Sequence, residues 1–228
     1  MVDLIFDTSS IISLATNNLL DTLSDMKKKF KGDFFISDSV KKESLDNPIT
    51  NRKYKLEAIM ISNLIQNNIL RIYSKVNIEQ KTMRVLDISN NIFSAYGNSI
   101  HILDKAEVES LVLTQLFKGV FVVDERNIRL LVEDYKKLAL LLERKLDTKI
   151  KINNQNIKLF QSEISNINII RSAELMTVAF EMGFFKEYEN KYASKKEILD
   201  GILWGLRLRG CAISTEEIEE LLKIERVK

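Results

Sequence analysis

The chain has few of the residue types that mark linkers, disulfide frameworks and histidine-based sites. Its 228 residues include only 7 glycines and 1 proline, so few segments are typical of linkers and we expect one compact, helix-rich unit. The single cysteine, Cys211, excludes an internal disulfide framework, and we expect it to be a buried small residue. The single histidine, His101, excludes a histidine-rich metal site and argues against a Ser-His-Asp triad.

Strong net charge and long apolar runs are also missing. With 34 basic and 32 acidic residues the net charge is only +2, so any binding of nucleic acid must come from local basic patches. No apolar run reaches about 18 residues, so we predict no membrane span. No basic region precedes an apolar core at the N-terminus, so we expect no signal peptide and take the cytoplasm as the default location.

Short apolar runs alternate with longer helical patterns along the chain. The runs predict strands at 2–6, 33–37, 69–76, 119–123 and 167–170. The longer patterns predict helices at 10–20, from Ser39 to a break at Asn47-Pro48, at 52–70, 79–96, 104–116, 127–146, 173–180 and 195–208, and from a capping box at Ser214 to Lys223. We interpret 149–160 as a hairpin or irregular loop. This alternation predicts a three-layer α/β/α fold with a central parallel sheet.

Four acidic residues occupy positions where such a fold could bring them together. Asp7 and Asp124 each follow a predicted strand, while Glu43 and Glu107 lie near the starts of predicted helices. Taken singly, each is best interpreted as a capping or exposed carboxylate. Together they would repel one another unless a divalent cation lay between them, and Mg²⁺ or Mn²⁺ prefers carboxylate oxygen. Such ions activate water and stabilise charge at a phosphodiester, so the set favours a metal site.

Four segments resemble motifs of one family. They read LIFDTSSII at 4–12, ISDSVKKE at 36–43, LDKAEVESL at 103–111 and VVDER at 122–126. In this order they resemble the acidic motifs of PIN-domain proteins, a fold of metal-dependent ribonucleases and toxin nucleases, and the helical tail at 198–222 is similar to that of one subgroup. The chain departs from the family pattern where Ala106 replaces a usual Gly, Ser110 a usual Ala, and Glu125 a common second Asp.

The resemblance implies one PIN-like domain over 1–228, with an insertion around 127–164 and a helical tail from about 187. It implies an endoribonuclease with Mg²⁺ or Mn²⁺ as cofactor. The implied catalytic and metal-binding residues are Asp7, Glu43, Glu107 and Asp124, with Asp104 as the alternative third ligand, and the supporting residues are Thr8, Ser9, Ser10, Glu125 and Ser172. Electrostatics alone suggests that Lys41, Lys42 and Arg126 contact phosphate. Glu109 lies two residues beyond Glu107, so we expect it to point in another direction from the helix.

Two other functions stay open at this stage. The altered third motif and the insertion would also suit a PIN-like module that binds RNA or a protein without cleaving. A toxin nuclease of a toxin–antitoxin pair is the other alternative, although the chain is long for one. The resemblance allows RNA, an antitoxin or another protein, and a second copy of the chain as partners.

Overall fold

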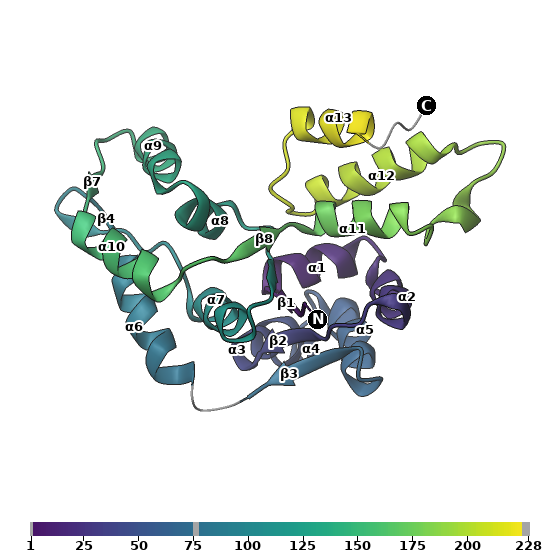
Figure 1. Cartoon of the computed structure of the whole chain (residues 1–228), viewed down its shortest axis with the longest axis horizontal. Coiled ribbons are helices and arrows are strands. Elements are labelled where there is room, and N and C mark those ends of the chain that lie inside the picture. Colours follow the sequence, from purple (N-terminus) through teal and green to yellow (C-terminus); the bar gives the residue numbers. More distant parts are fainter. Residues whose placement is uncertain (1, 75–77, 225–228) are drawn as a thin grey trace.

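A five-stranded, all-parallel sheet forms the centre of the computed structural model, which describes residues 2–74 and 78–224 (Figure 1). The strand order is β3-β2-β1-β6-β8. The strands are β1 (Leu4–Phe6), β2 (Phe34–Ser37), β3 (Leu70–Tyr73), β6 (Val120–Val122) and β8 (Asn168–Ile170). All three residues of the central strand β1 are buried, as expected for a parallel sheet covered on both faces.

Helices cover both faces of this sheet. One face packs against α7 (Lys105–Phe117), with α6 (Glu79–Asn90), α8 (Arg126–Glu133), α9 (Tyr135–Leu146) and α10 (Asn154–Glu163) in the same core. The other packs against α1 (Thr8–Thr16), α2 (Leu20–Lys29), α5 (Lys55–Gln66), α11 (Ser172–Glu181) and α12 (Lys195–Leu208). Alternate residues of β6 enter the two cores, Phe121 one and Val122 the other. The three-layer α/β/α prediction is therefore confirmed.

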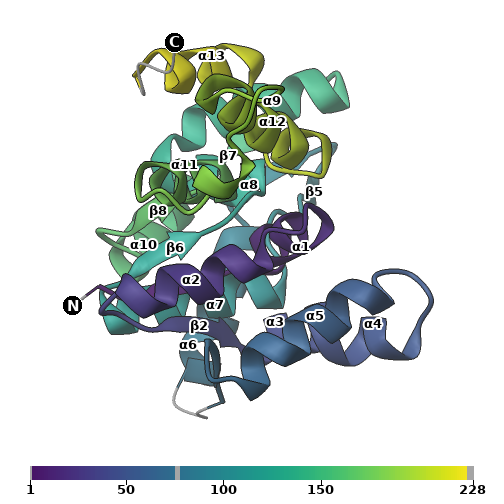
Figure 2. The same ribbon diagram turned by 90° about the vertical axis from the view of Figure 1, so that its right-hand side faces the viewer.

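The expected helical ending is present. After η3 (Lys186–Tyr188) the chain forms α12 and then α13 (Thr215–Ile224). These two helices stack at the opposite end of the molecule from α4 (Asn47–Thr50) and α5 (Figure 2). The predicted capping box begins α13: Ser214 N donates to Glu217 Oε2 at 2.7 Å, and Glu217 N donates to Ser214 Oγ at 3.2 Å. Within the described residues, no helix is long and apolar enough to cross a membrane.

The predicted break at Asn47-Pro48 is wrong. The helix passes from α3 (Asp38–Lys41) through a π-helical segment, η1 (Lys42–Asp46), into α4 (Asn47–Thr50). A proline in a regular helix clashes with the carbonyl four residues earlier. The wider π turn just before Pro48 relieves that clash, and π segments of this kind often occur near functional sites.

Three further predictions differ from the structure. They are the helix at 79–96, the helix at 127–146, and the hairpin or irregular loop at 149–160. The first helix ends at Asn90, and β4 (Phe93–Ala95) forms a small antiparallel sheet with β5 (Asn98–Ser99) and β7 (Lys151–Ile152). Tyr96 and Gly97 both have positive φ, which suits a two-residue hairpin turn. The second helix is divided at Asp134, whose extended backbone and side-chain cap start α9. Residues 154–163 form α10, started by an Asn153 side chain that accepts from two backbone N–H groups.

The first helix is shorter than expected, and the helix after it was missed. Asn18 adopts a left-handed conformation, with φ of 59°, and this turn separates α1 from α2. The strand predicted at 69–76 extends in part beyond the described residues, since 75–77 are not among them.

Candidate functional site

Asp7 lies directly after β1, at the carboxyl edge of the sheet and at the start of α1. Its Oδ2 accepts hydrogen bonds from Ser9 N at 3.0 Å and Ser9 Oγ at 2.7 Å, so it caps the helix. Its Oδ1 is buried and has no hydrogen-bond partner among the described residues. The residue is 2% exposed, and burial raises the pKa of its carboxyl to about 6 despite the Ser9 bonds, with a further rise from the nearby Asp104 charge.

Ser9 links Asp7 to the second acidic residue at this edge. Asp124 N donates to Ser9 Oγ at 3.1 Å, and Asp124 itself is 1% exposed. Both of its carboxylate oxygens are engaged by Ser172, whose N donates to Oδ1 at 2.7 Å and whose Oγ donates to Oδ2 at 2.6 Å. Ser10 Oγ lies within hydrogen-bonding distance of two backbone carbonyls, Asp7 O and Val122 O, and so ties β1 to β6.

The N-terminus of α7 brings two more carboxylates to the same edge. Asp104 and Glu107 form a reciprocal capping box: Glu107 N donates to Asp104 Oδ1 at 3.0 Å, and Asp104 N donates to Glu107 Oε2 at 2.8 Å. Glu107 is buried, and burial together with the charges of Asp7, Asp104 and Glu125 raises the pKa of its carboxyl to about 9. Both candidates for the third ligand thus lie in the cluster.

Glu43 joins this cluster from the π segment of the α3–α4 helix. Its Oε2 accepts a hydrogen bond from Thr8 Oγ1 at 2.7 Å. Partial desolvation raises the pKa of its carboxyl, and the charges of Asp104 and Glu109 raise it further. Three of the supporting residues predicted from the sequence therefore each bond to an acidic residue: Thr8 to Glu43, Ser9 to Asp7 and Ser172 to Asp124.

Glu109 contacts the start of α3 rather than the Asp104–Glu107 capping box. It is 5% exposed, and its Oε2 accepts from Ser39 N at 3.0 Å. Its charge nevertheless helps to raise the pKa of Glu43. All residues of α7 from Ala106 to Thr114 are buried, polar ones included, so the helix is covered on every side.

The three residues predicted to contact phosphate differ in their surroundings. Lys41 Nζ forms an ion pair with Asp46, at 2.9 and 2.8 Å to its two carboxylate oxygens, so the ammonium group of Lys41 is already neutralised. Lys42 and Arg126 are exposed. Arg126 lies two residues after Asp124, at the first turn of α8.

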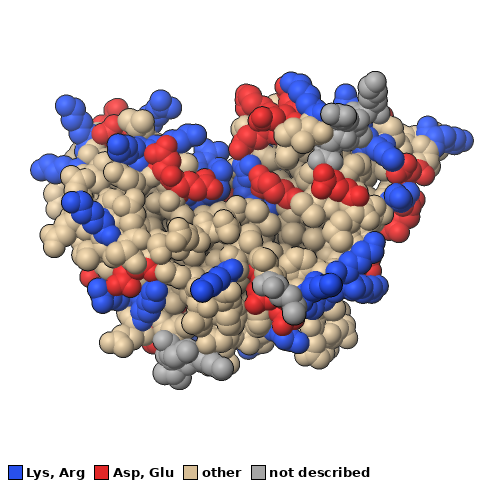
Figure 3. Space-filling model, in the orientation of Figure 1, with Lys and Arg blue, Asp and Glu red and all other residues tan. Residues whose placement is uncertain are grey.

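A cleft beside Arg126 was not foreseen from the sequence. It has a volume of about 740 Å³ and lies between α8–α9 and the segment leading into α13. The wall formed by α8 and α9 carries Arg126, Arg129, Lys137 and Arg144, together with Glu133 and Asp134. Figure 3 shows the hollow between the two upper lobes, with basic and acidic side chains around it. Within each helix the cations are three or seven residues apart, Arg126 with Arg129 and Lys137 with Arg144, and this spacing is the sequence signal for the wall.

A backbone hydrogen bond links the cleft to the acidic edge. Ala212, which lines the cleft, donates from its N to Asp124 O at 3.1 Å. Buried Arg171 donates to Ala212 O at 2.9 Å and to Glu217 Oε1 at 3.0 Å, and this fixes the start of α13 against the sheet. One residue of the cleft lining is therefore bonded directly to Asp124.

The side chains are close but not arranged as ready-made ligands. Among residues 2–74 and 78–224, no three Asp, Glu, His or Cys side chains are placed as they would be around one metal ion. In comparisons with known proteins, no family model, no curated protein and no solved structure matches the chain.

Proposed function

We propose that the chain is a PIN-like, divalent-metal-dependent endoribonuclease that acts in the cytoplasm. The observation that carries the proposal is the buried, unpartnered Oδ1 of Asp7, in a cluster where carboxylates raise one another's pKa. An unpaired buried acceptor is costly, and neighbouring like charges make ionisation costlier still. A divalent cation would give Oδ1 a partner and would offset the repulsion between the carboxylates. Perturbed carboxylates at a sheet edge are also typical of functional sites.

The donor set suits Mg²⁺ or Mn²⁺. All the candidate ligands are carboxylate oxygens, which hard cations prefer, and neither His101 nor Cys211 is needed. Asp7 would hold the ion through Oδ1, with Glu43, Glu107 and Asp104 as further ligands, directly or through water. When bound there, the ion would supply an activated water and charge stabilisation at the phosphate.

The surrounding hydroxyl groups have a positioning role in this proposal. Ser9 fixes Oδ2 of Asp7 and thereby aims Oδ1 away from the helix N-terminus. Thr8 orients Glu43 in the same way. Asp124 uses both oxygens on Ser172, so it supports the site through charge and structure, or ligates through remaining lone pairs.

The substrate in this proposal is single-stranded RNA, guided by the cleft beside Arg126. Lys137 and Arg144 line the cleft and make no ion pair within the described part of the chain, so both are free for phosphate oxygens. Lys42, which does not line the cleft, is a further candidate for contact with phosphate, whereas Lys41 is paired with Asp46. Cations near an active site bind phosphates without reading sequence.

A non-cleaving RNA- or protein-binding module is the second candidate. Two observations favour it: each carboxylate oxygen of Asp124 already accepts a hydrogen bond from Ser172, and the described side chains do not form a preassembled metal group. In that case the acidic cluster would be structural. A toxin role within a toxin–antitoxin pair is a narrower form of the first proposal.

Cleavage of a labelled single-stranded RNA tests the proposal. Wild type, Asp7→Asn and the control Asp87→Asn, which changes an exposed acidic residue of α6, are each assayed with Mn²⁺ and with EDTA. We expect Mn²⁺-dependent cleavage by wild type and Asp87→Asn, and a loss of at least about 100-fold in Asp7→Asn. Equal cleavage by all three proteins would contradict the site assignment. RNA binding without cleavage would favour the binding module.

A further inference from the structure

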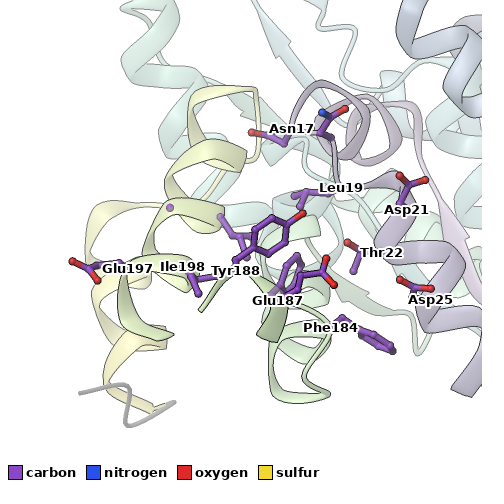
Figure 4. A pocket seen from close by; sticks show the side chains of 14 residues that line it. Asn17, Leu19, Asp21, Thr22, Asp25, Phe184, Glu187, Tyr188, Glu197 and Ile198 are labelled. Carbon is purple, nitrogen blue, oxygen red and sulfur yellow. The ribbon is translucent and has the colours of Figure 1, made fainter. Parts of the chain in front are cut away.

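A second concave site lies at the opposite end of α1 from Asp7. It has a volume of about 490 Å³ and is enclosed by the α1–α2 junction, the turn from α11 into η3, and α12 (Figure 4). We call it the α12 pocket. Its size is in the range of small-ligand sites, roughly 300–1,000 Å³.

The charged residues that line the α12 pocket are all acidic. Four acidic residues line it, and no lysine or arginine does. Asp25 is paired with exposed Lys28 at 2.6 Å, and Glu197 accepts from Ser194 N at 2.6 Å in a capping box. The other two acidic residues, Asp21 and Glu187, have neither a hydrogen bond nor an ion pair from any residue that the structure describes. The pocket therefore offers at least two free carboxylates to a cation.

Thr22 adds a buried polar group aimed into the same space. The residue is 9% exposed, and within 2–74 and 78–224 its hydroxyl has no hydrogen-bond partner. In Figure 4 this hydroxyl faces Glu187 and the ring of Tyr188 across the pocket. The hydroxyl oxygen itself is accessible and can accept a hydrogen bond from an N–H donor in the pocket.

The rest of the lining is apolar and aromatic. Leu19, Ile198 and Ile202 supply aliphatic surface, and the ring of Tyr188, 56% exposed, lies 6.4 Å from that of Phe185. Phe184 already holds the ammonium of Lys29 at 4.6 Å from its ring centroid, which shows that these rings accept cations. Methylene groups pack on such a surface while ammonium groups reach the acidic rim.

We propose that the α12 pocket binds a linear aliphatic polyamine. The alkyl chain lies on Leu19, Tyr188 and Ile198. One ammonium group lies between Asp21 and Glu187 and donates to the Thr22 hydroxyl, and a second reaches Asp25 or Glu197. An anion would meet only like charge, and a neutral ligand would leave the carboxylates unused. This site is independent of the proposed nuclease activity.

Isothermal titration of the full chain with spermidine tests this proposal. Asp21→Asn and Glu187→Gln should each raise the Kd about fivefold, since each removes one partly exposed charge pair. Thr22→Val, which keeps the shape and loses the hydroxyl, should raise it about threefold. Glu189→Gln, a neighbouring exposed acidic residue outside the lining, should leave the Kd unchanged. Thermal melts confirm that the variants are folded.

Three outcomes would overturn the proposal. The first is no spermidine binding by wild type at millimolar concentration, and the second is an equal loss in Glu189→Gln, which would indicate general attraction to acidic surface. The third is tighter binding of the peptide Ac-Lys-Leu-Lys-NH₂ than of spermidine, since the pocket would then serve a lysine-bearing protein segment. Loss of nuclease activity in any variant has no bearing on these results.

Discussion

Replacing Asp7 by asparagine should stabilise the metal-free protein. The pKa of Asp7 is raised from 3.8 to about 6, so ionised Asp7 costs about 3 kcal/mol of folding free energy above pH 6, at about 1.4 kcal/mol for each unit of pKa. Asparagine resembles the neutral form and avoids that cost, although it bonds less well with Ser9. We expect a gain of about 1–3 kcal/mol at pH 8, a rise in Tm on the order of 5 °C for a chain of this length.

The raised pKa of Asp7 determines how the stability difference between Asp7→Asn and wild type changes with pH. A carboxyl with a raised folded pKa is protonated in the native state while it is already ionised in the unfolded state, so native stability falls as pH rises from 3.8 to about 6. The advantage of Asp7→Asn should therefore be full above pH 6 and disappear below about pH 4. Thermal melts in EDTA at pH 4, 6 and 8 measure it. An Asp7→Asn protein less stable than wild type at pH 8 would refute the reasoning.

Three further predictions concern the same edge of the sheet. Ser172→Ala should cost about 1–3 kcal/mol in urea unfolding because Asp124 loses a hydrogen bond while buried, whereas Ser162→Ala on exposed α10 should stay within about 0.5 kcal/mol. Arg171→Met should cost about 2–3 kcal/mol and lower the hydrogen-exchange protection of α13 first, because Glu217 loses its partner; unchanged protection would contradict this. Saturating Mn²⁺ should raise the wild-type Tm more at pH 8 than at pH 6, since protons compete for the carboxylates; an equal rise would count against them as ligands.

The strands, and the meeting of Asp7 with Asp124, were predictable because they depend on local patterns. Short apolar runs such as 119–123 favour buried strands, and parallel strands bring the residues after their carboxyl ends to one edge. Asp7 and Asp124 meet there as expected, linked by Ser9. The capping box at Ser214 is also read from a four-residue pattern, whereas the one at Asp104 was not predicted.

The features that were missed depend on tertiary context. The Tyr96–Gly97 turn joins β4 to β5, and β4 also pairs with β7, about 60 residues away in the sequence. No local pattern marks that second pairing. The π segment before Pro48 depends on how the helix packs, and it determines where Glu43 points. Burial of Glu109 depends on the start of α3, and the basic cleft depends on how α8 and α9 face the C-terminal tail.

The central claim is that the Asp7 cluster binds a divalent cation. Electron paramagnetic resonance of Mn²⁺ titrated with the protein at pH 8 tests it most directly, because bound Mn²⁺ loses the sharp six-line signal of the free ion. The account predicts that wild type and Asp87→Asn reduce the free signal with a Kd at least about tenfold lower than Asp7→Asn or Glu107→Gln. Equal binding by all four proteins, or no binding by wild type at millimolar Mn²⁺, would contradict it.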